Sequence, residues 1–232
     1  MIPSVIILAG GLATRLRPIT ENIPKSLVEI NGRPFLHYQL VLLKKYGFNN
    51  VVLSVGHLGE QIEAAFGDGS EYGISLRYVY DGNTLKGTGG AVAAALSFLT
   101  EDFIVMYGDS YLKYDYREVY DFFTSNRQNA DGLMTVYENH GQFDRSNIVY
   151  ENNRIKVYDK EKQMPGMNFI DWGLGILTKK AFENHQQQKF DLATVYQALL
   201  KNDRLLGYEV DVRFYEVGSF QGLEEAREIL EV

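Results

Sequence analysis

The 232-residue chain is 45% hydrophobic and 23% charged, an ordinary globular composition with enough length for one α/β domain. Its formal net charge of −7 argues against a general nucleic-acid-binding protein, which would carry a basic surface. The absence of cysteine excludes disulfides, thiolate zinc sites and thiol nucleophiles.

The N-terminus and the apolar runs predict a cytoplasmic protein without a membrane partner. Met1-Ile2-Pro3 lacks the basic start of a signal peptide, and the apolar run Val5–Ala9 is too short for the apolar part of one. No apolar run approaches the ~18 residues that a membrane span requires.

The first half of the chain alternates strand-like apolar runs with helix-like segments. Such alternation is typical of a mainly parallel sheet with helices on both faces, so the predicted fold class is α/β. The expected strands are Val5–Ala9, Asn50–Val55, Leu76–Tyr80 and Phe103–Tyr107, and the expected helices are Leu36–Tyr46, Leu58–Phe66 and Gly90–Leu99.

After Tyr107 the alternation loosens, and short connections between the strand-like runs predict a more antiparallel half. No internal repeat or linker divides the chain, so we expect a single domain over residues 1–232. The elements expected here are helices at Tyr116–Ser125, Leu192–Leu200 and Leu223–Leu230 and strands at Leu133–Tyr137, Ile148–Tyr150 and Arg154–Tyr158.

The first strand leads into a glycine pair, Gly10-Gly11, which is followed by Arg15 and Lys25. Glycine lets backbone amides approach an anion, arginine can grip phosphate oxygens with two hydrogen bonds, and lysine supplies a point charge. Ligands of α/β folds bind beyond the carboxyl ends of the strands. The spacing matches neither G-x-G-x-x-G nor G-x-x-x-x-G-K-[ST], so the glycines alone are equally consistent with a plain turn.

Four segments, taken in chain order, favour a phosphate-binding loop over a plain turn. The first is L-A-G-G-x-A-T-R-L-x-P with P-K nine residues after Arg15, and the others are KGTGGAVAAAL, VMYGDSYL and FYEVGSFQGLEEA. Together they resemble the motifs of sugar-1-phosphate nucleotidyltransferases, which have a Rossmann-like, mixed and mainly parallel sheet flanked by helices. These enzymes join a nucleoside triphosphate to a sugar 1-phosphate and release pyrophosphate. Ala13 departs from the family's usual glycine, and Glu216 from its commoner aspartate.

The resemblance implies a nucleotide site. Arg15 would offset the charge of the triphosphate and the leaving pyrophosphate, Lys25 would stabilise the region of the α-phosphate, and Asp81 could accept hydrogen bonds from guanine. The other nucleotide-binding residues that it implies are Leu8, Ala9, Gly10, Gly11, Thr14, Gly87, Thr88 and Gly89.

The resemblance also implies a magnesium site. Asp109 ends the strand-G-D motif and would hold the ion, with Glu216 as the second carboxylate. By themselves Asp109 would be a turn residue and Glu216 a solvated charge at a strand edge. Magnesium takes one or two carboxylates plus substrate phosphates, which makes Mg²⁺ the expected cofactor. His37 and His57 have no partner at metal-ligand spacing, so we do not expect zinc.

The acceptor side is implied by four further positions. Lys160 would hold the sugar phosphate, with Lys162 as a competing alignment, and Asp171 stands where the family places an asparagine that contacts sugar hydroxyls. An ionised aspartate can accept hydrogen bonds from the same hydroxyls. Trp172 is interpreted as a packing residue. Gly108 and Asn147 complete the expected substrate-binding set.

The chain is closest in pattern to enzymes that activate heptose 1-phosphate with GTP, through its L-x-G-T-G-G-A segment. Uridylyl- and cytidylyltransferases remain rivals, as does transfer to phosphocholine, for which an aromatic cage would argue. A non-catalytic nucleotide-sugar sensor is the alternative from another class. A dinucleotide-dependent oxidoreductase is disfavoured because the G-x-G-x-x-G spacing is missing. A homodimer is expected only from the general frequency of symmetric dimers.

Overall fold

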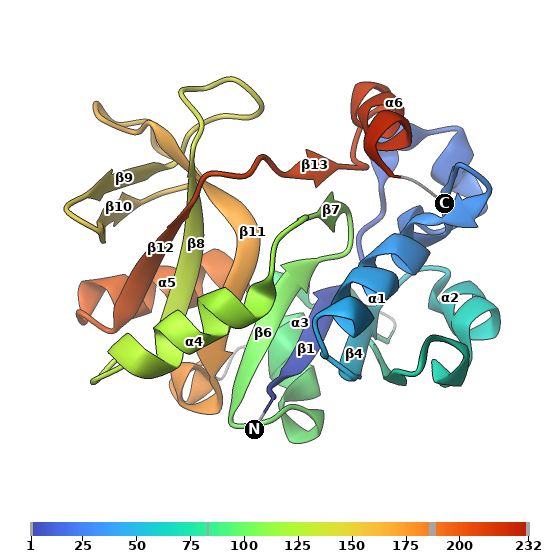
Figure 1. The fold of residues 1–232 in the computed structure, drawn as a ribbon, viewed down its shortest axis with the longest axis horizontal. Helices are drawn as coiled ribbons and strands as arrows, with labels where there is room; N and C mark the ends of the chain where they lie inside the picture. Colours follow the sequence, from blue (N-terminus) through green and yellow to red (C-terminus); the bar gives the residue numbers. More distant parts are fainter. Residues whose placement is uncertain (1, 83, 186–188, 231–232) are drawn as a thin grey trace.

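The computed structural model describes residues 2–82, 84–185 and 189–230, and its main feature is a nine-stranded mixed sheet (Figure 1). The strand order is β10-β9-β11-β6-β1-β4-β5, and β8 pairs with both β11 and β12. The strands are β1 (Ser4–Leu8), β4 (Asn50–Val55), β5 (Ser75–Tyr80), β6 (Asp102–Tyr107), β8 (Gly132–Glu138), β9 (Ile148–Glu151), β10 (Arg154–Tyr158), β11 (Phe169–Thr178) and β12 (Leu205–Val210).

Helices and two short ribbons complete the architecture. One ribbon pairs β2 (Glu29–Ile30) with β3 (Arg33–Pro34), and the other pairs β7 (Ser110–Tyr111) with β13 (Tyr215–Glu216). The helices are α1 (Phe35–Lys45), α2 (Gly59–Phe66), α3 (Gly87–Ala95), α4 (Tyr116–Asn126), α5 (Leu192–Lys201) and α6 (Phe220–Ile229).

The mainly parallel first half is confirmed. Val5 of β1 lies opposite Val51 of β4 on one side and Ile104 of β6 on the other, both in parallel register. Buried valine and isoleucine favour such central strands, which are covered on both faces. In the second half β11 runs antiparallel to β6, β8 and β9, as the short connections predicted, whereas β12 joins β8 in parallel.

The sequence patterns missed β11 and β12 and began α3 too late. The β11 segment, FIDWGLGILT, contains Asp171 and two glycines, which weaken a strand pattern. Its pairing with β8 shifts register between Asp171 and Gly175, and Gly173 has a φ of 101°. The sequence predicts the start of helix α3 at Gly90 because glycines lower helix propensity, whereas the helix begins at Gly87.

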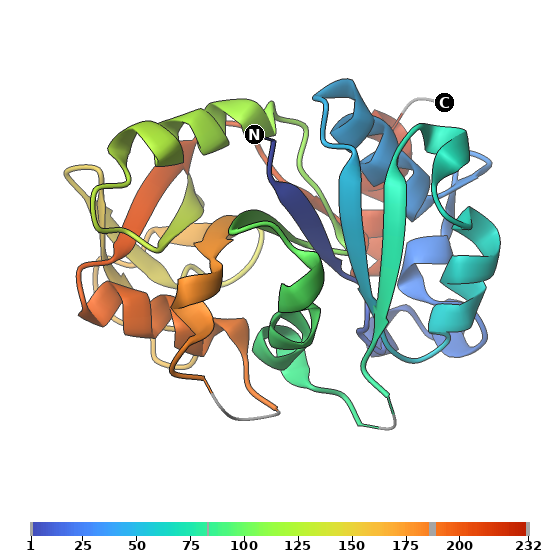
Figure 2. The same ribbon diagram turned by 90° about the horizontal axis from the view of Figure 1, so that it is seen from below.

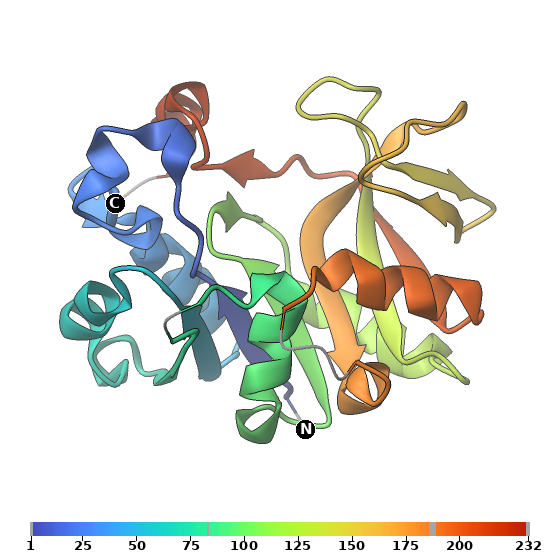
Figure 3. The same ribbon diagram turned by 180° about the vertical axis from the view of Figure 1, so that it is seen from behind.

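The sheet separates two apolar layers. Residues alternate along β1, so that Val5 and Ile7 belong to the cluster under α1, α2 and α4, and Ile6 belongs to the cluster under α3 and α5. Figure 2 shows the helices on the two sides of the sheet, and Figure 3 shows α3 and α5 on the face opposite α1 and α4.

A third cluster joins the two ends of the chain. Leu16, from the loop after β1, packs with Val217 and with Leu223 of α6. Figure 1 shows α6 beside the early part of the chain, with β13 leading into it. This packing places β13 and α6 next to the loop that contains Arg15 and Lys25.

In the part of the chain that the structure describes, no helix combines the length and the apolar character that crossing a membrane would require.

Candidate functional site

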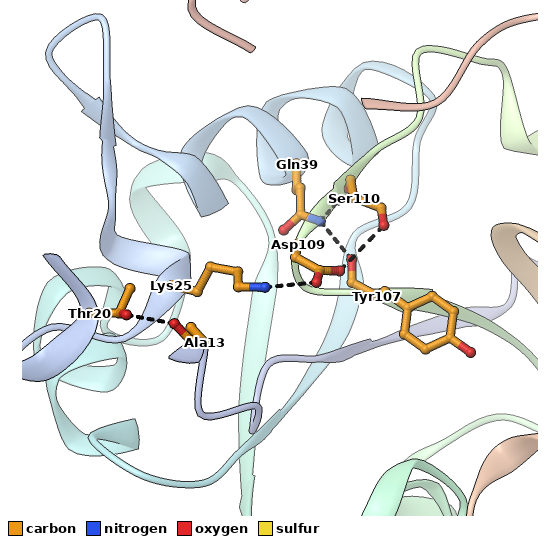
Figure 4. Close-up of polar contacts among 7 residues, drawn as sticks. All are labelled: Ala13, Thr20, Lys25, Gln39, Tyr107, Asp109 and Ser110. Atoms are coloured by element: carbon orange, nitrogen blue, oxygen red, sulfur yellow. Dashed lines mark hydrogen bonds and ion pairs between the residues drawn. The ribbon is translucent and has the colours of Figure 1, made fainter. Parts of the chain in front are cut away.

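The loop after β1 is shaped by Ala13 and Thr20. Ala13 has φ 48° and ψ 39°, a left-handed conformation that costs a non-glycine residue roughly 1–2 kcal/mol. Glycine adopts this conformation without that cost, which gives a physical reason for the glycine expected at this position from the resemblance. The Thr20 hydroxyl is buried and donates a 2.7 Å hydrogen bond to the Ala13 carbonyl (Figure 4). The turn that follows, Thr14–Leu16, buries Leu16 and exposes Arg15.

Asp109 lies in the turn that follows β6. The Gly108 amide donates to the Leu8 carbonyl at 3.0 Å, and a Cβ at Gly108 would lie only 2.8 Å from that oxygen, so this approach requires glycine. The Asp109 carboxylate accepts from Lys25 Nζ at 2.9 Å, and the two side chains are 32% and 16% exposed (Figure 4). Two residues that are 84 positions apart thus form an ion pair at the carboxyl edge of the sheet.

Glu216 reaches the same turn through the β7–β13 ribbon. It lies opposite Ser110 in antiparallel register, and the neighbouring Val217 amide donates to the Asp109 carbonyl at 2.8 Å. Burial raises the pKa of Glu216 to about 7, with further increases from Asp109 and Asp144 and opposing effects from Arg15 and Lys25.

The two carboxylates fit a divalent cation. The charge of Asp109 disfavours the ionised form of Glu216, and a bound cation would relieve that repulsion. Across residues 2–82, 84–185 and 189–230, no group of three or more Asp, Glu or His side chains forms a denser metal site. A pair of carboxylates suits magnesium, which shares its remaining positions with phosphate and water.

Arg15 and Lys25 converge near the same ribbon. A Cβ built on Gly218 would lie 3.2 Å from Arg15 Nη2 and 3.8 Å from Lys25 Nζ. A side chain at position 218 would therefore crowd the guanidinium, which would have to shift by a few tenths of an ångström. Gly218 lies within the closing motif FYEVGSFQGLEEA, but nothing in the sequence distinguishes it as a site residue. The structure brings Arg15, Lys25, Asp109 and Glu216 into one charged cluster.

The raised pKa of Glu216 predicts that stability depends on pH. Unfolded Glu216 loses its proton near pH 4.5, whereas the folded protein retains that proton until about pH 7. In this window the folded state binds more protons than the unfolded state, so stability falls as pH rises. We expect Glu216→Gln to be more stable than the native protein above pH 7 by about 3 kcal/mol, with little difference below pH 4.5.

Urea unfolding from pH 4 to 8, without metal or nucleotide, measures this difference. Glu29→Gln is the matched control because it makes the same substitution at an exposed position. A Glu216→Gln difference that stays constant across the window would contradict a buried, electrostatically opposed Glu216.

A pocket next to the glycine pair is mostly apolar and contains one carboxylate. Its lining includes Asp81, which is 9% exposed and lies close to Gly10: a Cβ at Gly10 would be 3.4 Å from Asp81 Oδ2. Burial raises the pKa of Asp81, and Lys86 partly opposes this. The lining residues are Leu8, Gly10, Gly11, Ser54, Asp81, Leu85, Gly87, Thr88 and Ala91.

Sequence reasoning named most of this lining but missed Ser54, Leu85 and Ala91. Ser54 lies near the end of a predicted strand, the usual place for ligand contacts in an α/β sheet, so strand-end position could have indicated it. The Ala9 amide donates to the Ser54 carbonyl at 2.8 Å, which joins the loop to β4. Leu85 and Ala91 are the first and last residues of the L-x-G-T-G-G-A segment, so that motif could have indicated them.

Residues 87–89, which are predicted to bind the nucleotide, also pack against the segment before α5. The Thr88 hydroxyl accepts from the Leu192 amide at 2.8 Å. A Cβ at Gly89 would lie 2.3 Å from the Phe190 ring, and the Gly89 amide donates to the Phe190 carbonyl at 3.0 Å. Gly87 and Thr88 line the pocket, whereas Gly89 joins α3 to the segment before α5.

Three of the predicted acceptor-side residues lie together. Lys160 Nζ is 3.6 Å from Asp191 Oδ1 and 5.9 Å from the centre of the Tyr107 ring. Burial raises the pKa of Asp171, and the charge of Lys160 opposes this. Asn147 Oδ1 accepts from the Asp171 amide at 3.4 Å. Lys160 is therefore the lysine associated with Asp171.

Lys162 lies outside this group. The Lys162 side chain is exposed, and its amide donates to Asp159 Oδ1 at 2.9 Å.

The buried Tyr158 hydroxyl has no hydrogen-bond partner among the described residues, and its ring lies 6.2 Å from that of Tyr196. Trp172 is a packing residue, 1% exposed, whose indole donates to the Val212 carbonyl, so it cannot form an aromatic cage for choline.

Comparison with known proteins identifies the family of the chain. Residues 4–231 match the family described as Nucleotidyl transferase. The chain is 30% identical to the low-salt glycan biosynthesis nucleotidyltransferase Agl11 of Haloferax volcanii, with 97% of this chain and 64% of that protein aligned. It is 32% identical to the D-glycero-alpha-D-manno-heptose 1-phosphate guanylyltransferase of Aneurinibacillus thermoaerophilus, with 92% of each aligned. It is 28% identical to the N-acetylmuramate alpha-1-phosphate uridylyltransferase of Neisseria meningitidis, with 96% of each aligned.

Solved structures share the fold. A putative glucose-1-phosphate thymidylyltransferase from Bacillus anthracis superposes with a TM-score of 0.87 at 20% identity, covering 99% of this chain and 96% of that one. HddC from Yersinia pseudotuberculosis, complexed with GMP-PN, superposes with a TM-score of 0.76 at 25% identity, covering 97% and 98%.

Proposed function

The chain belongs to the nucleotidyl transferase family and is a sugar-1-phosphate nucleotidyltransferase, and from this premise we propose that it transfers GMP from GTP to a heptose 1-phosphate and releases pyrophosphate. One observation carries the proposal. The loop after β1 brings two cations, Arg15 and Lys25, to the carboxylates Asp109 and Glu216, and the glycines of the same loop line the pocket that contains Asp81.

The choice of GTP is supported by Asp81. An ionised carboxylate accepts hydrogen bonds with both oxygens, and guanine offers adjacent N1–H and N2–H donors on one edge. Uracil offers a single N–H between two carbonyls, which a carboxylate would repel. The buried position of Asp81 makes an unpaired carboxylate costly, and this favours the base that can pair with both oxygens.

The proposed reaction needs no covalent enzyme intermediate. The acceptor phosphate is largely dianionic at pH 7, since its second pKa is about 6, and its oxygen attacks the α-phosphorus in line. Lys160 positions this phosphate, Arg15 binds the leaving pyrophosphate, and Lys25 stabilises charge at the α-phosphate. Positioning and charge stabilisation supply most of the catalysis in such transfers.

Magnesium is the proposed cofactor, and Asp109 and Glu216 would hold it. When bound it neutralises triphosphate charge. Asn147 and Asp171 would orient the acceptor by accepting hydrogen bonds from its hydroxyl groups, since Asp171 lies beside Lys160 and Asn147.

Pyrophosphate release tests the proposal, with GTP, UTP, CTP and ATP each offered to a panel of sugar 1-phosphates and phosphocholine. We expect the highest kcat/KM with GTP and a heptose 1-phosphate, and Asp81→Asn should reduce the preference for GTP over UTP. A preference for UTP in the native protein would instead favour an activity like that of the Neisseria relative. Nucleotide binding without turnover on any acceptor would favour the sensor.

Gly11→Val is expected to abolish nucleotide binding and to leave the fold intact. Among the described residues other than its chain neighbours, no heavy atom lies within 4 Å of a Cβ built on Gly11, so the fold has room for the new side chain, which would take up space at the wall of the pocket that Gly11 lines. Calorimetry with GTP measures the affinity, and thermal unfolding checks the fold. Normal affinity in a folded Gly11→Val protein would make this loop a structural turn only.

A further inference from the structure

Gln39 is a polar side chain in the apolar layer beneath α1, and it is 1% exposed. Leu36, Leu40 and Leu43 of the same helix belong to the surrounding core. Gln39 Nε2 donates to the Tyr107 carbonyl at 3.1 Å and to the Ser110 carbonyl at 2.8 Å (Figure 4). Both acceptors are carbonyl oxygens, which can only accept, so the orientation of the amide is determined by its partners.

These two hydrogen bonds bracket Asp109. The parallel ladder between β1 and β6 ends where Leu8 lies opposite Tyr107, and the β7 ribbon begins only at Ser110. Between them the Gly108 and Asp109 backbone is held by two single hydrogen bonds, from the Gly108 amide and to the Asp109 carbonyl. The Gln39 side chain, which comes from α1, joins the two ends of this turn by donating to a carbonyl on each side of it.

The chemistry of the position favours glutamine. One neutral group must donate twice, which an apolar side chain cannot do, and lysine or arginine would bury a second cation near Lys25. Gln39 Oε1 is buried and accepts no hydrogen bond from any residue that the structure describes. An unpaired acceptor offsets part of what the two donated bonds contribute to stability, so these bonds matter chiefly for where they hold the turn.

We propose that Gln39 is a positioning residue for the reaction, which holds the Gly108–Asp109 turn so that the Asp109 carboxylate meets Lys25 and faces Glu216. This inference rests on the proposed function, because it assigns Gln39 an effect through Asp109. Gln39 itself touches neither substrate.

Gln39→Met tests the inference, because methionine has a similar volume and no donor. We expect kcat to fall about 10- to 100-fold, the usual cost of losing a group that orients a metal ligand, with KM for both substrates unchanged within about twofold. Hydrogen exchange of a peptide covering residues 107–111 should be faster than in the native protein. Leu43→Ala is the control: it destabilises the same helix without touching the turn and should leave kcat and that exchange unchanged.

If Gln39→Met does not fold, Gln39→Glu keeps the shape and replaces the donor nitrogen by oxygen, and the same changes are expected. Native kcat in either folded variant, or exchange in residues 107–111 that matches Leu43→Ala, overturns the inference. Asp109→Asn separates this outcome from failure of the proposed function. If Asp109→Asn is inactive and Gln39→Met is fully active, only the inference fails, whereas an active Asp109→Asn removes the premise itself. If the native protein turns over no substrate pair, the exchange comparison alone decides whether Gln39 holds the turn.

Discussion

Asp109→Asn and Glu216→Gln are each expected to lower magnesium-dependent kcat by roughly 100- to 1000-fold while the protein stays folded, by analogy with removing one group that stabilises transition-state charge. The physical reason is that both carboxylates lie at one turn, joined by the β7–β13 ribbon and by the Val217 amide on the Asp109 carbonyl. Steady-state kinetics across a magnesium titration measures the loss. Asp211→Asn removes an exposed carboxylate elsewhere and should retain native kinetics.

The double variant distinguishes a shared ion from two separate roles. If Asp109 and Glu216 act through one cation, the second substitution should cost much less than the first, because the ion is already lost. Additive losses would indicate independent roles. Full activity of either single variant at limiting magnesium, or activity that survives complete chelation, would contradict the shared-metal mechanism.

Arg15→Ala and Lys25→Ala are expected to have different kinetic effects. Losing one phosphate-directed charge should cost about 2–4 kcal/mol of transition-state stabilisation, which is roughly 30- to 1000-fold in rate. Arg15 is exposed next to Gly218 and should contribute to both nucleotide affinity and turnover. Lys25 is 16% exposed and paired with Asp109, so its loss should fall mainly on kcat.

Initial rates at varied GTP concentration separate the two parameters, with calorimetry for the affinity. Lys162→Ala is the matched control because its side chain is exposed and its amide is bonded to Asp159, outside the cluster of Arg15, Lys25, Asp109 and Glu216. Unaltered kinetics in folded Arg15→Ala and Lys25→Ala proteins would reject the assignment of both cations to phosphate.

Much of the fold could be predicted from local pattern. β-Branched runs such as Val5–Ala9 and Asn50–Val55 alternate with helix-like segments, and this alternation identified the parallel half because each element buries its own apolar face. The strand β11 was missed because its pattern is interrupted by Asp171 and by glycines. Residues 175–177 of this strand are paired in antiparallel register with β6 on one side and β8 on the other, which no local pattern reports.

For the candidate site, too, local sequence indicated some features and only the tertiary structure showed others. Motifs identified Arg15, Lys25, Asp109 and Glu216 as residue types suited to phosphate and magnesium, although no spacing in the chain says that they meet. Their meeting depends on the β7–β13 ribbon and on the packing of α6 against the loop that contains Leu16. Roles for these residues in catalysis remain predictions that the experiments above test.

By itself the sequence determined which chemical groups the protein has available and which segments form its parallel core, because residue type and short-range periodicity are local properties. Only the tertiary structure decided that Lys25 pairs with Asp109, that Asp109 raises the pKa of Glu216, and that Lys160 rather than Lys162 acts on Asp171. Gln39 makes the same point: its helix position identifies it as a polar residue on an apolar face, but its partners lie 68 and 71 positions away. Hydrogen bonds and charge interactions act over a few ångströms of space, and the distance between two side chains is set by the packing of the whole sheet and its helices.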